Sequence, residues 1–226
     1  MRDHYDDGVN DTAPGAIRLT ARGAQTRERI VRAATELMRT RGVGATTLDD
    51  VRAAGAVSKS QLYRHFADKT DLVHAVIEQV GDHVVARERA LLEGVTKLDE
   101  LQRWRDALLA RSAAENARYG CALGSLANEV SDQDAVARAR LDALLDTWAE
   151  LFAAIFTRFR STGVLPADTD AERLSTGFLA TVQGGYLLAQ TARDVAPLAA
   201  SVDMALDHLR LLAATAATDS LSATPS

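Results

Sequence analysis

The sequence predicts an all-α protein of about nine helices, and three observations support this. Alanine, leucine and arginine are abundant, whereas aromatic residues make up 5% of the chain and prolines number four. That composition favours helices. Apolar residues recur at the three- and four-residue spacing of a helix, and no segment shows the convincing alternation of a strand. The hydrophobic fraction of 47% is ample for a buried core.

The first two predicted helices lie one after the other near the start of the chain. One begins near Gln25, shows charged residues between its apolar positions, and ends at Gly42, where glycine favours a helix C-terminus. A shorter helix starts at Thr46 or Thr47, because either hydroxyl can cap free backbone N–H groups. It ends at Gly55 after about two turns.

A third short helix follows directly. Ser58 and Gln61 have the spacing of a capping box. Leu62 and Phe66 lie four residues apart, on the inner side, and Asp68 can cap a fourth helix. Two short helices joined by a tight turn and braced by longer ones have the plan of a helix-turn-helix.

The remaining chain is predicted to form long helices separated by short loops. Gly163 and Pro166 interrupt the apolar pattern once, and Pro197 suits a helical first turn. The predicted helices cover about 69–92, 98–114 and 121–130, a stretch that starts at Ser131, one that starts at Thr169, and a last one that ends near 217.

Charge is distributed unevenly. The net charge of the chain is −5, yet residues 16–70 hold eleven Lys or Arg against five Asp or Glu. The rest of the chain is acidic. A basic block on an acidic body indicates a partner that is a polyanion. A solvated helix face is the alternative interpretation.

Residues 55–72, GAVSKSQLYRHFADKTDL, resemble the helix-turn-helix of the TetR/AcrR (tetracycline-repressor) family. The similarity covers about residues 25–75, and residues 119–126 resemble the ligand domains of multidrug-type members. One departure concerns Gly55-Ala56, where the family commonly has Ala-Gly. Either the turn starts one residue sooner, or Ala56 adopts a strained conformation.

The resemblance implies a DNA-binding domain and a helical domain for ligand binding and dimerisation through a four-helix bundle. The small residues of the last two long helices, Gly184 and Gly185 among them, would allow close approach at that dimer surface. We therefore divide the chain into a flexible arm (1–20), a helix-turn-helix domain (21–70), a ligand-binding and dimerisation domain (71–217) and a disordered tail (218–226).

The third helix supplies the candidate contacts with DNA. Side chains at the start of such a helix reach base edges in the major groove. Lys59 can donate to guanine, and Gln61 can pair with adenine, although a capping box explains Gln61 equally well. The remaining candidates, for bases or phosphates, are Thr47, Ser58, Ser60, Tyr63, Arg64, His65 and Lys69.

Candidate ligand contacts lie on the middle helices. For most of them core packing is the alternative, but Asn128 and Gln183 are polar within apolar stripes and need partners. We expect a lipophilic, aromatic or polycyclic ligand. We interpret the single cysteine as a small buried filler rather than a redox switch. The candidates are Trp104, Leu108, Cys121, Asn128, Trp148, Phe152, Phe178, Gln183 and Tyr186.

We therefore predict a homodimeric, sequence-specific regulator, namely a repressor that a small lipophilic effector releases from a palindromic DNA operator. The alternatives are a regulator or activator that requires its ligand, and an architectural DNA-binding protein without a ligand. No catalytic motif or metal-ligand spacing is present, so we expect neither an enzyme, a cofactor nor a metal. The absence of an apolar leader or span predicts a cytoplasmic protein with no membrane partner.

Overall fold

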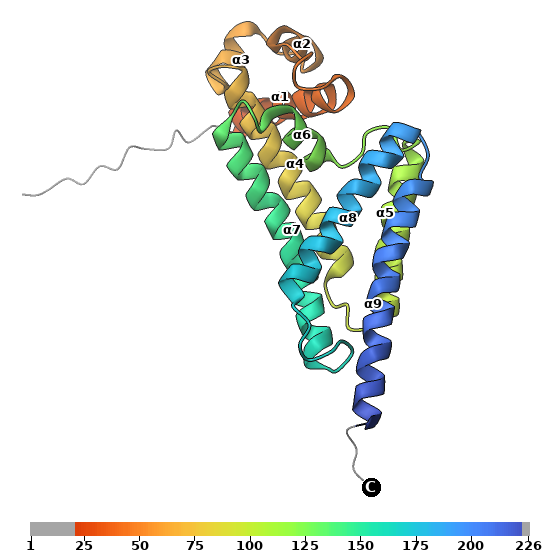
Figure 1. Cartoon of the computed structure of the whole chain (residues 1–226). Helices are drawn as coiled ribbons and strands as arrows, with labels where there is room; N and C mark the ends of the chain where they lie inside the picture. The colour runs from red at the N-terminus through yellow and green to blue at the C-terminus, as the bar shows by residue number, and fades with distance from the viewer. Residues whose placement is uncertain (1–20, 223–226) are drawn as a thin grey trace, which may run out of the picture.

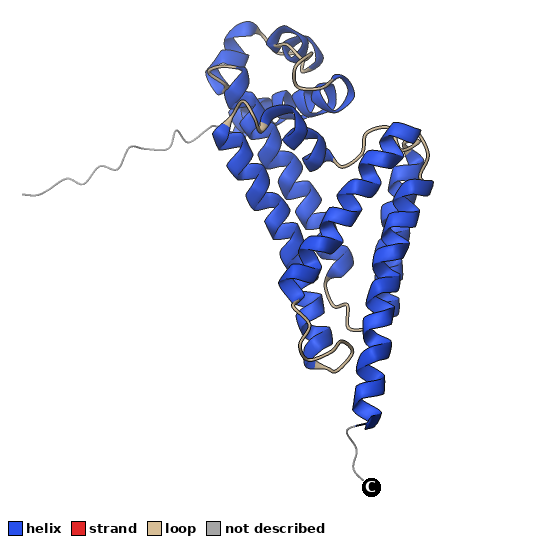
Figure 2. Ribbon diagram, in the orientation of Figure 1, coloured by secondary structure: helices blue, strands red, loops and turns tan. Residues whose placement is uncertain are grey.

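The structure, a computed structural model, describes residues 21–222, with side chains through Thr218. Within that range it consists of nine α-helices and one 3-10 helix, without strands (Figure 2), which confirms the predicted fold class. The helices are α1 (Ala21–Arg41), α2 (Leu48–Ala54), α3 (Lys59–His65), α4 (Lys69–Leu92), η1 (Leu98–Glu100), α5 (Leu101–Ala114), α6 (Ala122–Val130), α7 (Ala135–Ser161), α8 (Ala171–Ala192) and α9 (Ala196–Ser222).

Helices α1, α2 and α3 form a small domain at one end of the molecule (Figure 1). The predicted caps are confirmed. Thr47 and Asp50 form a capping box at the start of α2, and Ser58 and Gln61 form another at the start of α3. Asp68 caps α4 by accepting a bond from a backbone N–H of its first turn. These caps satisfy donors that a helix N-terminus leaves free, so they define where each helix begins.

The turn between α2 and α3 resolves the Gly55-Ala56 question. Gly55 keeps a right-handed helical conformation, and Ala56 has a φ of 47°. The left-handed residue of this turn is therefore the alanine, whose Cβ makes that conformation more costly than it would be for glycine.

Helix α4 connects the small domain to the helical body. It starts beside α3 and runs along α7 (Figure 1). The two helices cross closely at Gly81, where a Cβ would lie 2.4 Å from Leu144 Cδ1. Helix α4 therefore packs on helices of both parts, namely α1 in the small domain and α5, α6 and α7 in the body.

Aromatic side chains form the centre of the body. Trp104 of α5 meets Phe152 of α7 edge-on at 5.2 Å, and Phe178 of α8 lies 4.8 Å from Phe152. Phe156 completes the cluster at 5.7 Å from Phe178. All four are buried, and such contacts add to the burial of large apolar surfaces. They hold α5, α7 and α8 together.

Some predicted helix boundaries are wrong by a few residues. Helix α1 begins at Ala21, four residues before Gln25. Helix α7 is capped by Asp134, which accepts from two backbone N–H groups, whereas Ser131 is the C-cap of α6. Carboxylate acceptors are strong helix caps, so Asp134 rather than Ser131 sets the start.

The last helix extends further than predicted. Helix α9 continues through Ser222, so residues 218–222 are helical rather than disordered. Alanine-rich sequence extends a helix readily once tertiary contacts have begun it. The predicted arm, 1–20, and residues 223–226 lie outside the described residues. No helix in the described range is both long and apolar enough to span a membrane.

Candidate nucleic-acid interface and cavity

Helix α3 presents one side to the core and the other to solvent. Leu62 is buried, whereas Lys59, Ser60, Tyr63 and Arg64 are exposed. The Tyr63 side chain is 48% exposed although it is aromatic. An exposed row with two cationic groups and two hydroxyls can donate to both phosphates and base edges.

The capping box occupies the other two predicted residues at the start of α3. Gln61 Oε1 accepts from the Ser58 backbone N–H at 2.8 Å, and Ser58 Oγ accepts from the Gln61 N–H at 3.2 Å. Bidentate pairing with adenine requires both the oxygen and the nitrogen of the Gln61 amide. In this conformation Gln61 positions the helix, and adenine pairing would require the box to open.

Two predicted phosphate contacts already have partners within the chain. Thr47 Oγ1 donates to Asp50 Oδ2 at 2.6 Å. Lys69 Nζ donates to the Gly44 carbonyl at 3.3 Å, which ties the start of α4 to the loop after α1. A lysine ammonium has three donors, so Lys69 can hold this loop and still face a phosphate.

His65, at the end of α3, is half-buried. Burial lowers its pKa, and the positive charges of Arg64 and Arg27 lower it further. A lowered pKa means that the imidazole is neutral at neutral pH. His65 therefore offers one N–H donor rather than a full positive charge.

A cavity of about 850 Å³ lies where the small domain meets the body. Its wall comes from α1, α4, the end of α5 with the loop that follows, α6 and α8. Apolar side chains such as Val80 and Val84 cover part of it. The wall also contains six arginines but only two glutamates: Arg32, Arg39, Arg87, Arg111, Arg118 and Arg193, with Glu115 and Glu129.

A buried carboxylate organises two of these arginines. Glu88 of α4 is 0% exposed, and its Oε2 accepts from Trp104 Nε1 at 2.8 Å. Its Oε1 accepts from Arg87 Nη2 at 2.8 Å and from Arg111 Nη2 at 3.2 Å. Buried charges persist when they are paired in this way. Glu88 thus holds two guanidinium groups in the cavity wall.

Tyrosines complete the polar part of the wall. Arg39 lies 3.9 Å from the ring centroid of Tyr119, and Arg118 lies 5.4 Å from it. Cation–π contacts of this kind fix the ring between the two guanidiniums. Tyr186 of α8 is buried, and that burial raises its pKa to about 12, so its hydroxyl remains a donor.

Glu129 joins the cavity wall to the small domain. Its Oε2 accepts from the Val43 N–H at 2.6 Å and from the Gly44 N–H at 3.4 Å. The carboxylate approaches Gly42 so closely that a Cβ there would lie 2.8 Å from it. Glu129 and Lys69 therefore hold the α1–α2 loop from two sides.

Comparisons with known proteins identify the family. Residues 30–76 match the family "Bacterial regulatory proteins, tetR family", and residues 97–205 match "Tetracyclin repressor-like, C-terminal domain". An HTH-type transcriptional regulator of Mycobacterium tuberculosis is 31% identical over 179 residues, which cover 76% of this chain and 88% of that protein. The chain belongs to the TetR family.

Further relatives agree with this assignment. The transcriptional regulator AcuR of Cereibacter sphaeroides is 29% identical over 205 residues, or 84% of this chain and 91% of that protein. The crystal structure of a regulatory protein TetR from Rhodobacter sphaeroides matches with a TM-score of 0.74 and 25% identity, over 81% of this chain and 98% of that one. This TetR-family chain is a DNA-binding transcriptional regulator, and family members dimerise and bind small effectors.

Only two of the nine predicted ligand contacts of this TetR-family regulator, Cys121 and Tyr186, line the cavity. Asn128 is exposed on α6, away from the wall. Gln183 Nε2 donates a hydrogen bond to Cys121 Sγ at 3.4 Å. The other seven predicted ligand contacts do not line this cavity and are buried, half-buried or exposed elsewhere: Trp104, Leu108, Asn128, Trp148, Phe152, Phe178 and Gln183.

Sequence reasoning missed the arginines of the cavity. Arginine is normally a surface residue, so none of them stood out by type. The available signal was Glu88, which falls four residues after Val84 on the apolar stripe of α4. A charged residue at a core position needs buried partners, and here those partners are cavity residues.

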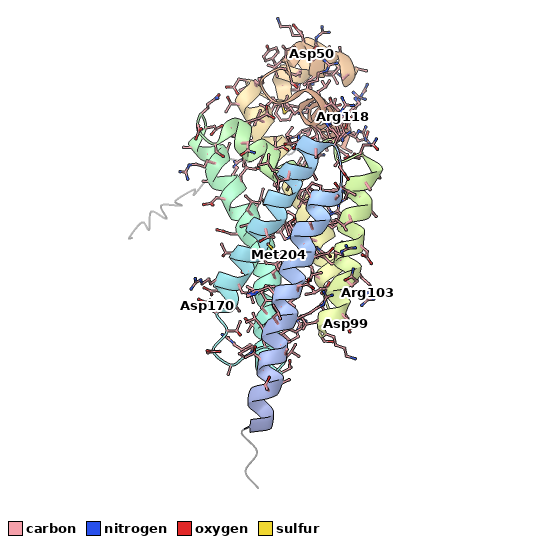
Figure 3. All side chains as sticks on the ribbon, turned by 45° about the vertical axis from the view of Figure 1, so that its right-hand side comes forward. Asp50, Asp99, Arg103, Arg118, Asp170 and Met204 are labelled. Carbon is pink, nitrogen blue, oxygen red and sulfur yellow. The ribbon has the colours of Figure 1, made fainter. Side chains whose placement is uncertain are left out.

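Helices α8 and α9 of this regulator carry an exposed apolar face. Met204 on α9 (Figure 3) is 63% exposed, and Leu187, Leu188 and Leu211 are exposed to a similar degree. Gly184 faces open space. Gly185, which we predicted for the dimer surface, instead packs against Ser201 and Leu198 of α9 within the protomer, whereas Gly177 is open.

Proposed function

We propose that this chain is a repressor of a palindromic operator and that a small molecule in the cavity releases it from DNA. The observation that carries the proposal is the position of the cavity. Arg32, Thr35 and Met38 of α1 belong to the DNA-binding domain, and they share one wall with residues of α4, α6 and α8. A molecule bound there contacts both domains at once, and we expect it to act by binding alone, in the cytoplasm, where the DNA is.

We assign the operator contacts to the free side of α3. Lys59 and Arg64 carry charge without an ion-pair partner among residues 21–218, and Ser60 and Tyr63 offer hydroxyls beside them. His65, and Lys69 at the start of α4, lie at the border of this face. Contacts with phosphates would set the register, and base contacts from the first turn would set the sequence.

The route from cavity to DNA runs through Glu129. Helix α6 supplies several wall residues, among them Cys121 and Leu126, and it ends one residue after Glu129. A ligand that displaces α6 therefore moves the carboxylate that holds Val43 and Gly44. Because this loop leads into α2, the orientation of the helix-turn-helix changes with it.

Such coupling is reciprocal. A ligand shifts the equilibrium only as far as it prefers one orientation over the other. If ligand binding weakens operator binding by some factor, operator binding weakens ligand binding by the same factor. The proposal therefore predicts lower effector affinity in the presence of operator.

The exposed face of α8 and α9 supports a dimer built through these helices. Two recognition helices about 34–36 Å apart match successive major grooves on one side of DNA. Met204→Glu would place a charge in that interface, so it should yield monomers and reduce operator affinity by at least about 100-fold. Light scattering and anisotropy measure the two effects. Val136→Glu, at an apolar position on α7 that is 52% exposed, is the matched control and should remain dimeric.

Fluorescence anisotropy with DNA from the upstream region of the gene, and with a scrambled duplex, tests the function directly. We expect selective binding that weakens steeply with salt and that an effector reverses. Binding that appears only when effector is added would favour a ligand-requiring regulator or activator. Equal, weak affinity for both duplexes would indicate an architectural protein and contradict the proposal.

A variant of Glu129 tests the route. Glu129→Ala should accelerate hydrogen exchange of the Val43 and Gly44 amides and weaken operator binding about 3- to 10-fold, because the loop must then be ordered on binding. Asp132→Ala, just beyond the end of α6, removes an exposed carboxylate that pairs with no side chain among residues 21–218 and should change neither measurement. Unchanged exchange at Val43 in the Glu129 variant would exclude this route.

A further inference from the structure

We infer that the cavity binds an organic anion, whose acidic group is held by arginines of α4, α5, the loop after α5 and the end of α8. This inference rests on the proposed function, and it names the chemical class of the effector. It departs from the purely lipophilic ligand that the sequence alone predicted. The reason is the charge of the wall, which no pattern of apolar residues could show.

The arginines of the wall carry more positive charge than the neighbouring carboxylates neutralise. Glu88 is one carboxylate shared by two arginines, and one of its oxygens also serves Trp104. Each guanidinium has five N–H donors, of which Glu88 takes two from Arg87 and one from Arg111. Donors on both side chains therefore remain available at the cavity surface.

Two further arginines have no ion-pair partner in the part of the chain whose side chains the structure describes. Among residues 21–218, no carboxylate lies within ion-pair distance of Arg118 or Arg193. Arg193 Nη1 instead donates to the Arg118 carbonyl at 3.3 Å, which brings the two residues together at the rim. Like charges gathered at a concave surface create a positive potential that attracts an anion.

The other side of the cavity suits a carbon skeleton. Val76, Val80 and Val84 form an apolar stripe of α4 along the wall, and Met38 and Leu126 add to it. Pockets that bind drug-sized molecules have volumes of about 300–1,000 Å³ and few polar groups that fix orientation. A planar guanidinium matches a carboxylate or phosphate bidentately. The geometry thus fits a carboxylate or phosphate on an apolar body.

A pair of fluorescent probes separates charge from apolar character. 8-Anilinonaphthalene-1-sulfonate is an anion, and N-phenyl-1-naphthylamine has the same ring framework without the sulfonate. Titrated into the full-length dimer, the anion should bind at least about tenfold tighter, with one site per chain, which is the fold-change of one charged hydrogen bond. Equal affinities for the two probes would overturn the inference.

The double variant Arg118→Gln/Arg193→Gln tests the arginines. Neither side chain has an ion-pair partner among residues 21–218, and both are exposed, so their loss should leave the fold intact. The double variant should bind the anionic probe about tenfold more weakly, and its affinity for the neutral probe should change less than twofold. Arg103→Gln is the matched control, since Arg103 is exposed on α5 toward the opposite end of the body from Arg118 (Figure 3). An equal loss of affinity for both probes, or a loss of affinity in the Arg103→Gln control, would contradict the assignment of the arginines to the anion site.

The probe experiment contains no DNA, so its outcome is separate from that of the operator assay. Arginine-dependent binding of the anion without any effect on operator affinity would support the anion site and refute the proposed coupling. Release of the operator by neutral molecules alone, with no preference for the anionic probe, would leave the repressor function standing and refute the anion site.

Discussion

The exposed face of α3 and the wall of the cavity both combine cationic and aromatic side chains, but they are assembled differently. The face of α3 comes from seven consecutive residues, Lys59–His65. The wall extends from Arg32 to Arg193 and draws on helices from both domains. A face on one helix follows from helical periodicity, whereas a cavity exists only where several helices fail to fill the space between them.

The same contrast applies to single residue types. Tyr63 and Phe152 are both aromatic, yet one is nearly half exposed and the other is buried within a cluster of rings. Arg87 forms an ion pair with the buried carboxylate of Glu88, whereas Arg64 has no ion-pair partner among residues 21–218. Residue type therefore predicts the environment of a side chain on α3 but not in the body, where neighbours distant in sequence decide. Three variants and one alkylation experiment test this difference.

The largest effect is expected in the aromatic cluster. Phe152→Ala should lower the free energy of unfolding by about 3–5 kcal/mol, because it leaves a cavity among Trp104 and Phe178. Urea denaturation measures it. Val136→Ala, at an exposed position, should lower it by less than about 0.5 kcal/mol. A small loss at Phe152, with loss of effector binding instead, would restore Phe152 as a ligand contact.

On α3, the proposed recognition helix, a substitution should alter operator binding and not stability. Lys59→Ala should weaken operator affinity by about 1–3 kcal/mol, or roughly 5- to 150-fold, and leave the unfolding midpoint unchanged. Anisotropy and thermal melting measure the two quantities. Lys97→Ala, which removes an exposed lysine from the far end of the body, is the control. If the Lys59 and Lys97 variants bind the operator with equal affinity, α3 is not the recognition helix.

A smaller effect is expected in the turn before α3. Ala56→Gly should stabilise the protein by about 0.5–1 kcal/mol, because glycine adopts the observed φ of 47° without a Cβ clash. Ala54→Gly, at the end of α2, should destabilise it by a similar amount. Destabilisation by both variants would mean that Ala56 is unstrained.

The last prediction concerns the reactivity of Cys121, in the cavity wall, where the smallest effect on function is expected. Burial raises the pKa of its thiol, so the reactive thiolate is scarcer than in an unfolded chain at the same pH. Alkylation by iodoacetamide at pH 8 should be at least about tenfold slower in the folded protein than in urea. Because the chain has one cysteine, mass spectrometry gives the rate directly. Rapid alkylation of the folded protein would point to a reactive sensor thiol.

The amino-acid sequence by itself determined the helical class, the helix-turn-helix and most helix starts. These depend on interactions within a few residues: the capping boxes at Thr47 and Ser58, and the apolar spacing of Leu62 and Phe66. The candidate DNA-contacting face follows for the same reason, since periodicity alone separates Lys59 from Leu62. Local physics is enough to predict local structure.

Only the tertiary structure decided which side chains enclose the cavity. Trp104 and Phe178 are apolar enough for a pocket, but they pack against each other, and Arg111 and Arg118 face the space that remains. It also decided that Gly185 packs within the protomer and that Ala56 adopts the left-handed conformation. Each outcome depends on where residues distant in the chain come to rest, and such packing has no signature in the spacing of neighbouring residues.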